Sequence, residues 1–328
     1  MPIPKPMPIP MSILVPEHIH EELSGPASAA APNVTLLPYP EDGSLPHAWQ
    51  EAEGVLRWVA GKRYAPLVAD GPKVRWLHTA SAGVDHVLTP AVKAKPNLVV
   101  TDSGPAFEIA ISEFVLAWML LVARRLPELM AHQKAHRWES VVQQELYGQT
   151  VGIVGLGPIG QGVASRAKAF GMRTLGLRRT QSPVPHVDEV LIGTDGLSRL
   201  LTESDYIVLA AALTGETKAL LGPAQIALLK PTAWLINIAR GGLVDEPTLI
   251  DALREKKIAG ACLDVFAQEP LPADSPLWDL PNVHIAPHNS SGWTAGLRER
   301  QKTLFLDNLR RFALGEPLES GVDIARGY

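Results

Sequence analysis

The chain has 328 residues, of which 46% are hydrophobic and 20% charged, and its formal net charge is −4. This is the composition of an ordinary globular protein, long enough for two domains that each bury a core. The slightly negative charge gives no overall electrostatic surface for nucleic acid, so we expect no nucleic-acid partner and local positive sites for any anionic ligand.

Cysteine content and apolar runs bear on location. The single cysteine, Cys262, excludes an intrachain disulfide and favours a reducing, cytoplasmic setting. Residues 1–10 alternate proline with apolar residues, which excludes the apolar core of a signal peptide and predicts a flexible leader. We expect no apolar run elsewhere to be long enough to span a bilayer, and hence no membrane partner.

The first third of the chain predicts a small parallel α/β domain. Short apolar runs alternate with helix-compatible stretches, and the expected strands are residues 12–15, 34–37, 54–56, 74–77 and 98–100. Residues 106–130 then predict one long helix. It is apolar on most sides, so we expect it to be buried between domains or subunits.

A second α/β domain follows, with a regular alternation of strand and helix that predicts a doubly wound sheet. The expected strands are residues 149–154, 173–177, 206–210, 233–238, 260–264 and 284–285, and the expected helices are 159–170, 222–229 and 245–255. A last helix, about 294–313, has no strand after it in this domain. We expect it to return and pack on the first domain.

A glycine fingerprint follows the first strand of the second domain. It reads Gly155-Leu156-Gly157-Pro158-Ile159-Gly160 and opens a helix, the context that a dinucleotide site requires. Gly155 makes the turn, Gly157 lets the main chain approach a pyrophosphate, and Gly160 allows close packing of helix on strand. We therefore expect these six residues to bind a dinucleotide.

The type of cofactor is decided about 20 residues further on. NAD sites usually carry Asp or Glu there, whereas this chain has Arg178, Arg179 and Thr180. Two guanidinium groups and a hydroxyl suit a ribose 2′-phosphate, which an acidic residue would repel. The sequence predicts NADP(H) as the preferred cofactor, with NAD(H) possible; a solvated basic loop is the alternative.

Three residues that are far apart in the sequence supply a cation, a carboxylate and an imidazole. Arg240 ends an expected strand, where arginine can hold a carboxylate and polarise a carbonyl. Glu269 could accept a hydrogen bond from a ring N–H of His288, which would fix the tautomer and favour the charged imidazole. The charged ring is a general acid that can protonate the carbonyl oxygen. Alone, Arg240 could be a surface charge and His288 a structural histidine.

Other positions receive expected roles in binding or packing. Asp264 ends a strand and could bind the nicotinamide carboxamide. Asp245 is expected to cap a helix and His284 to pack within its strand. Further cofactor contacts are expected at Ala212, Thr214, Ile238, Ala239, Arg240 and His288. Main-chain N–H groups near Ala82 and Gly83 could bind a carboxylate. We expect no metal ion.

These residues resemble the NAD(P)-dependent D-2-hydroxy-acid dehydrogenases, and within them the glyoxylate/hydroxypyruvate reductases. The resemblance covers nearly the whole chain and rests on the glycine fingerprint, Ser81–Asp85, Asn237–Asp245, Leu263–Phe266 with Glu269-Pro270-Leu271, Pro287-His288 and the closing Val322–Tyr328. Two departures are Ala210-Ala211-Ala212, where a proline is common before Leu-Thr, and Asn289–Trp293 in place of small apolar residues. Trp293 could narrow the pocket or simply pack.

The resemblance implies two Rossmann-like, doubly wound parallel-sheet domains with the active-site cleft between them. Residues 11–112 and 292–328 would form the substrate domain and 113–291 the dinucleotide domain. It also implies a homodimer built around the long helix after Pro105. Arg240 would anchor the substrate, His288 would be the acid/base with Glu269 as its partner, and the Ala82-Gly83 main chain would be a second carboxylate contact.

The sequence therefore predicts NADPH-dependent reduction of glyoxylate or hydroxypyruvate to the D-2-hydroxy acid. One alternative is a D-2-hydroxy-acid dehydrogenase for a bulkier 2-oxo acid. D-3-phosphoglycerate dehydrogenase is less favoured because the NAD-type acid and a C-terminal regulatory domain are missing. Formate dehydrogenase is disfavoured because its relatives use glutamine where Glu269 stands. An alternative of another class is a dinucleotide-sensing protein like the transcriptional co-repressors that share this triad.

Overall fold

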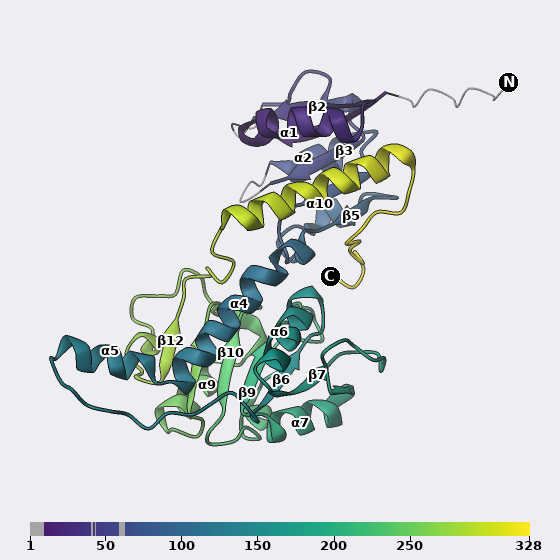
Figure 1. Cartoon of the computed structure of the whole chain (residues 1–328). Coiled ribbons are helices and arrows are strands. Elements are labelled where there is room, and N and C mark those ends of the chain that lie inside the picture. The colour runs from purple at the N-terminus through teal and green to yellow at the C-terminus, as the bar shows by residue number, and fades with distance from the viewer. Residues whose placement is uncertain (1–9, 41, 43, 59–62) are drawn as a thin grey trace. The chain divides into compact units, whose positions relative to one another are not determined.

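Two parallel β-sheets organise the chain, each with its own helices (Figure 1). The computed structural model describes residues 10–40, 42, 44–58 and 63–328, so all but the last residue of the expected leader lies outside the described residues. The chain divides into unit 1, Met1–Ala106 with Ala295–Tyr328, and unit 2, Phe107–Thr294. The sequence predicts these domain boundaries between residues 112 and 113 and between residues 291 and 292.

Unit 1 contains a five-stranded sheet in the order β2-β1-β3-β4-β5. Its paired strands are all parallel and are β1 (Met11–Pro16), β2 (Val34–Tyr39), β3 (Gly54–Arg57), β4 (Trp76–Thr79) and β5 (Val99–Thr101). A short 3-10 turn, η1 (Trp49–Glu51), precedes β3. The order is one of the two common doubly wound arrangements.

Side-chain alternation along β1 explains why helices cover both faces of this sheet. Ile13 and Val15 join a buried cluster with α1 (Glu17–Ala30) and α10 (Ala295–Leu314). Leu14 points to the other face and joins a cluster with α2 (Tyr64–Asp70) and α3 (Pro90–Lys93). The expected return of the C-terminal helix to the first domain is therefore confirmed.

Unit 2 contains a seven-stranded parallel sheet in the order β12-β11-β10-β9-β6-β7-β8. The strands are β6 (Thr150–Val154), β7 (Arg173–Leu177), β8 (Glu189–Leu191), β9 (Tyr206–Leu209), β10 (Trp234–Asn237), β11 (Gly260–Leu263) and β12 (Val283–Ile285). The strand order reverses between β6 and β9, the point where open α/β sheets bind ligands. The predicted fold class, two doubly wound α/β domains, is confirmed, although β8 was not expected.

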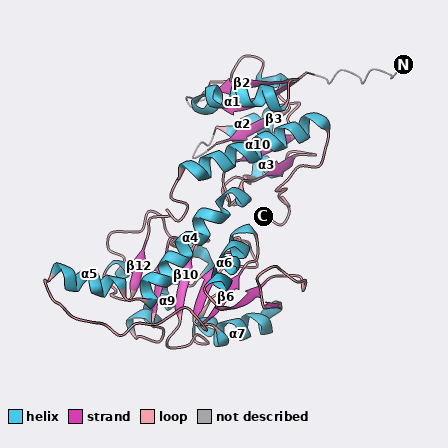
Figure 2. Cartoon of the chain, viewed as in Figure 1, coloured by secondary structure: helices cyan, strands magenta, loops and turns pink. Residues whose placement is uncertain are grey.

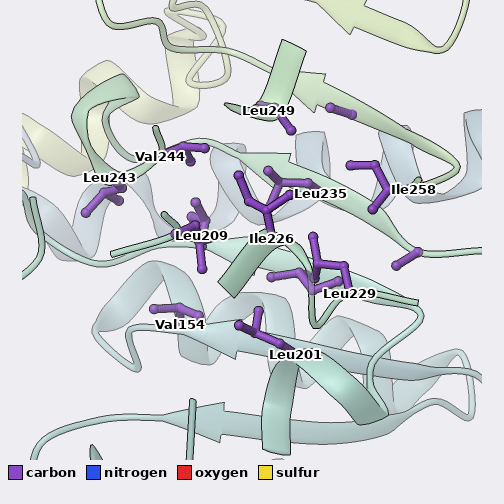
Figure 3. Close-up of a cluster of buried hydrophobic side chains, with 14 of the residues drawn as sticks. Val154, Leu201, Leu209, Ile226, Leu229, Leu235, Leu243, Val244, Leu249 and Ile258 are labelled. Atoms are coloured by element: carbon purple, nitrogen blue, oxygen red, sulfur yellow. The ribbon is translucent and has the colours of Figure 1, made fainter. Parts of the chain in front are cut away.

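Helices and turns alternate with these strands (Figure 2). They are α4 (Gly104–Ala123), α5 (Leu126–Lys134), α6 (Pro158–Ala169), α7 (Gly193–Glu203), α8 (Pro223–Ile226), α9 (Glu246–Arg254), η2 (Gly241–Leu243) and η3 (Pro276–Trp278). Figure 3 shows Leu209 and Leu235 of the sheet packing with Ile226 of α8 and Leu249 of α9. α6 packs beside β6 and β7, and its Arg166 pairs with Glu108 of α4 at 2.6 Å.

The single helix expected over residues 106–130 is wrong, because the structure ends α4 at Ala123 and starts α5 at Leu126. Arg125, between them, has a left-handed φ of 48°. Pro127 in the first turn of α5 explains the break, because proline has no N–H to continue a helical ladder and clashes with the preceding turn.

α4 also corrects an expectation about membranes. It has 20 residues and contains an 18-residue stretch with a mean hydropathy of 1.9, so by length and composition it could cross a membrane, contrary to the sequence prediction. Within the structure 56% of this stretch is buried. A largely buried helix of a protein core has the same length and composition.

Candidate active site

The candidate residues of unit 2 gather at one edge of its sheet. Because the seven strands are parallel, the residues that follow each strand emerge at the same, carboxyl edge. The residues that emerge there are Gly155 after β6, Arg178 after β7, Ala210 after β9, Ile238 to Arg240 after β10, Asp264 after β11 and Ala286 to His288 after β12. Sequence positions more than 100 residues apart are thus brought to one edge.

The glycine fingerprint forms a tight turn from β6 into α6. Gly155 has a left-handed φ of 99°, and a Cβ on Gly160 would lie 2.0 Å from the Gly155 carbonyl oxygen, so both positions require glycine. A Cβ on Gly157 would meet nothing within 4 Å, which leaves open space over the main chain at the N-terminus of the 12-residue α6. The geometry suits an approaching phosphate.

The arginines after β7 differ in their partners. Arg178 is half-buried and its Nη1 donates to Oγ of Ser182 at 3.1 Å. Arg179 is exposed and its Nη2 donates to Oε2 of Glu216 at 2.7 Å. Thr180 is exposed. The end of β7 therefore presents basic groups, as the sequence indicates, but one of them is paired with a carboxylate from the loop after β9.

The loop after β9 is closed by two threonines. Oγ1 of Thr217 donates to the Ala212 carbonyl at 2.6 Å and accepts from the Thr214 N–H at 2.8 Å. Ala212 is exposed and Thr214 half-buried. Both expected cofactor contacts thus lie on a defined turn beside the strand-order reversal, on the same stretch as Glu216.

Arg240 lies on a turn that Asn237 organises. The Asn237 side chain is 1% exposed; its Nδ2 donates to the Arg240 carbonyl at 3.0 Å and its Oδ1 accepts from Ala239 N–H at 3.1 Å. Arg240 itself is half-buried, and its Nη1 donates to the Ala239 carbonyl at 2.7 Å. Ile238, on the same turn, is buried. Asn237 is not among the site residues predicted from the sequence, although its place at the strand end was a signal.

Gly241 allows this turn to lie against the loop that follows β11. A Cβ at this position would be 1.9 Å from the Phe266 carbonyl carbon. Any other residue would push the Arg240 turn away from the segment that leads to Glu269. The Gly-Gly pair after Arg240 therefore has a packing reason.

The predicted pairing of His288 with Glu269 is present. Nδ1 of His288 lies 2.7 Å from Oε2 of Glu269, and Oε1 of the same carboxylate accepts from the Phe266 N–H at 3.0 Å. Both side chains are partly exposed, 48% for His288 and 35% for Glu269. Nε2 makes no hydrogen bond to any described residue, so it can meet a ligand.

Asp264 has a structural role that the sequence analysis did not anticipate. It is fully buried; Oδ1 accepts from the Asn289 N–H at 2.6 Å, Oδ2 from the Ser290 N–H at 3.0 Å, and its carbonyl from the His288 N–H at 2.8 Å. The carboxylate thereby holds the loop on which His288 sits at a left-handed φ of 52°. A contact from Asp264 to the nicotinamide carboxamide stays a prediction.

The structural roles predicted for Asp245 and His284 are confirmed. Asp245 is the N-cap of α9, where its Oδ1 accepts from the Thr248 N–H at 3.1 Å and the bonds to Thr248 lower the pKa of the carboxyl. His284 stacks on Trp234 with ring centroids 5.8 Å apart, and burial lowers its pKa. Trp293 is 57% exposed, so it does not pack into the core of unit 2.

Ala82 and Gly83 lie in unit 1, after β4, and both are half-buried. Arg57, which is 6% exposed, contacts the start of this loop. Its Nη1 donates to Oγ1 of Thr79 at 3.2 Å and to Oγ of Ser81 at 3.4 Å. Burial lowers the pKa of Arg57. Arg57 is not among the site residues predicted from the sequence, where a charged residue at the end of an apolar strand was the signal for it.

Comparison with known proteins agrees with this geometry. Residues 116–290 match the model of the D-isomer specific 2-hydroxyacid dehydrogenase, NAD binding domain. A glyoxylate reductase of Thermococcus gammatolerans is 35% identical over 85% of this chain and 86% of its own length. Glyoxylate/hydroxypyruvate reductase B of Pectobacterium carotovorum is 37% identical, over 85% of this chain and 88% of its own.

A solved structure extends the similarity to the whole fold. The D-isomer specific 2-hydroxyacid dehydrogenase of Xanthobacter autotrophicus, solved with NADPH and MES, superposes with a TM-score of 0.85 and is 31% identical. The match covers 97% of this chain and 100% of that one. With its NAD-binding domain, its two parallel sheets and relatives aligned over most of their length, the chain belongs to the D-isomer specific 2-hydroxyacid dehydrogenase family, oxidoreductases that act on a CH–OH group with NAD(P).

Proposed function

We propose that this protein reduces a small 2-oxo acid, glyoxylate or hydroxypyruvate, with NADPH. Hydroxypyruvate would yield the D-2-hydroxy acid. The observation that carries the proposal is the 2.7 Å contact of His288 Nδ1 with Glu269, at the sheet edge that also carries Arg240 and the glycine fingerprint. Relatives named glyoxylate reductase and glyoxylate/hydroxypyruvate reductase support the choice of substrate.

The chemistry needs a proton for the carbonyl oxygen and a cation for the carboxylate. With Nδ1–H donated to Glu269, Nε2 of the imidazolium gives its proton to the oxygen and His288 becomes neutral. The Glu269 carboxylate stabilises the charged ring before transfer and keeps its orientation afterwards. Arg240 holds the substrate carboxylate through charge-assisted hydrogen bonds and polarises the carbonyl. A second carboxylate contact from the Ala82-Gly83 main chain is part of the proposal.

The residues present fit a phosphorylated dinucleotide. The open space above Gly157 at the N-terminus of α6 suits the pyrophosphate, and Arg178, Arg179 and Thr180 suit a 2′-phosphate. When bound, reduced nicotinamide supplies the hydride for the carbonyl carbon. A relative solved with NADPH supports NADP(H) as the preferred cofactor, with NAD(H) possible.

Two substitutions test the roles of Arg240 and His288. Arg240→Gln and His288→Gln should each lower kcat/KM by about 100-fold or more, while NADPH binding measured by fluorescence stays close to wild type. Lys256→Gln, an exposed change beyond the far end of α9, is the control. Near-normal turnover in either variant would overturn its assignment.

A substrate panel separates the proposal from its alternatives. Hydroxypyruvate and glyoxylate are compared with branched and aromatic 2-oxo acids and with D-3-phosphoglycerate in the reverse direction. Preference for a bulky 2-oxo acid or for phosphoglycerate would replace the substrate and keep the chemistry. No turnover on any of them, with capture of a stable protein partner that responds to nucleotide, would favour a dinucleotide-sensing protein.

We propose a homodimer, because several apolar residues on and after α5 are exposed. They are Leu126, Met130, Trp138 and Val142, with exposed fractions of 41%, 60%, 104% and 86%. Exposed apolar side chains that gather in one patch mark interfaces between subunits. Light scattering after size exclusion measures the mass, and a monomer would contradict the proposal.

The single buried Cys262 supports a cytoplasmic location.

A further inference from the structure

One ion pair joins two loops on either side of the glycine fingerprint. Arg179, two residues after β7, donates through Nη2 to Oε2 of Glu216 at 2.7 Å, and Glu216 lies in the loop after β9. In the sheet β6 lies between β7 and β9, as Figure 1 shows. The ion pair therefore spans from one neighbour of β6 to the other, on the edge where β6 gives rise to the fingerprint.

The main chain that carries Glu216 is well defined. Hydrogen bonds of Thr217 with Ala212 and Thr214 close the turn, and the Ala219 N–H donates to the Gly242 carbonyl at 2.8 Å. The side chains themselves stay accessible, 44% exposed for Arg179 and 77% for Glu216. A ligand anion can therefore reach Arg179, and Glu216 can be displaced without unfolding the turn.

We propose that Glu216 competes with the ribose 2′-phosphate for Arg179 and thereby limits the preference for NADPH over NADH. The inference rests on the proposed role of Arg179 in binding that phosphate. A phosphate dianion and a carboxylate are both acceptors for one guanidinium, and their negative charges repel each other when both lie beside it. NADH has a hydroxyl at this position and leaves the ion pair intact. The competition therefore weakens the binding of NADPH alone.

The test is a fluorescence titration of NADPH and of NADH, at low salt and without substrate. Glu216→Gln keeps the shape of the side chain and removes its charge, so the Kd for NADPH should fall by about threefold. The Kd for NADH should stay unchanged. Glu203→Gln is a control for the loss of a carboxylate, because Glu203 pairs with Arg173, the first residue of β7, at 2.8 Å and with Arg199 at 2.6 Å, at the opposite edge of the same sheet.

A double-mutant cycle shows whether the effect passes through Arg179. Arg179→Gln should weaken the binding of NADPH and leave the binding of NADH unchanged. In this background Glu216→Gln should have lost most of its effect on the Kd for NADPH. The inference would be overturned if Glu216→Gln still lowered the Kd for NADPH in the Arg179→Gln background. It would also be overturned if Glu216→Gln changed the Kd of both cofactors equally, or if Glu203→Gln had the same effect. An unchanged Kd for NADPH in Glu216→Gln would overturn it too.

The failure of the inference and the failure of the cofactor assignment can be told apart. If Arg179→Gln weakens NADPH but Glu216→Gln changes nothing, Arg179 binds the phosphate and the competition is wrong. If Arg179→Gln leaves NADPH binding unchanged, the assignment of Arg179 is wrong and the inference falls with it. Neither result bears on Arg240, Glu269 or His288, whose variants are tested by turnover.

Discussion

The buried carboxylate of Asp264 holds the loop that carries His288. Its two oxygens accept from the N–H groups of Asn289 at 2.6 Å and Ser290 at 3.0 Å, and its carbonyl accepts from the His288 N–H at 2.8 Å. A buried charge that is satisfied in this way fixes main-chain positions, because breaking any of its bonds leaves a charged atom without a partner. The position of the proposed acid is thus set from the end of β11.

Asp264→Asn should therefore impair both stability and turnover. The amide presents an NH2 group to one of the two N–H donors, which costs about 1–3 kcal/mol of unfolding free energy and displaces the loop. Urea unfolding and kcat for hydroxypyruvate are the measurements, and the exposed Asp274→Asn is the control. Wild-type values of both quantities in Asp264→Asn would show that the loop does not depend on this carboxylate.

Glu269→Gln tests the charge beside His288. Gln can still accept from Nδ1–H but carries no negative charge, so the protonated imidazole needed for reduction is less favoured. We expect kcat to fall on the order of 10²-fold with NADPH affinity unchanged. Glu255→Gln, just after α9, makes the same charge change on an exposed residue. If the two variants were equally active, Glu269 would have no part in proton transfer.

Asn237→Ala tests the turn that presents Arg240. Removing the amide leaves the Ala239 N–H and the Arg240 carbonyl without their side-chain partner, so the guanidinium should be less well placed. We expect KM for the 2-oxo acid to rise about tenfold, with a smaller effect on the Kd for NADPH. A KM equal to that of wild type would mean that the turn holds without Asn237.

Stability at acidic pH should depend on His78 of unit 1. Its Nδ1 bonds to Oγ1 of Thr101 at 2.8 Å, and burial lowers its pKa from 6.5 to about 3. The unfolded chain thus binds a proton that the folded chain excludes. The contribution of His78 to the free energy of unfolding is complete above pH 6.5. It is lost as the pH falls toward 3, by about 1.4 kcal/mol per pH unit.

The measurement is urea unfolding at several pH values for wild type and His78→Gln. The variant should be less stable at neutral pH but should lose less stability between pH 6.5 and 5, because it lacks the excluded proton. His47→Gln, at an exposed histidine, should keep the wild-type dependence. Parallel curves for wild type and His78→Gln would refute the role of His78.

The sequence predicted the parts of the site that depend on local pattern and on sheet polarity. Apolar strands followed by glycine, Arg240 or Asp264 place these residues at one edge as soon as the sheet is parallel. The pairing of His288 with Glu269 followed from chemistry, and the structure has it at 2.7 Å. The cap at Asp245 was local and was equally predictable.

Features that depend on packing between distant segments could not be read from the sequence. The pair Arg179–Glu216 joins residues 37 apart and exists only because β9 lies next to β6 in the sheet. The partners of Asp264 are main-chain groups 25 and 26 residues away, which leave no side-chain signal. The break at Arg125 was missed because the apolar pattern continues across Pro127.

The most direct test of the proposed reaction follows the reduced-nicotinamide absorbance of the purified protein with hydroxypyruvate or glyoxylate, using NADPH and NADH in parallel. We expect rapid loss with NADPH, slower loss with NADH, and D-glycerate as the product from hydroxypyruvate. Loss that is faster with NADH would contradict the cofactor assignment. No loss with either cofactor and either acid would contradict the account of the substrate.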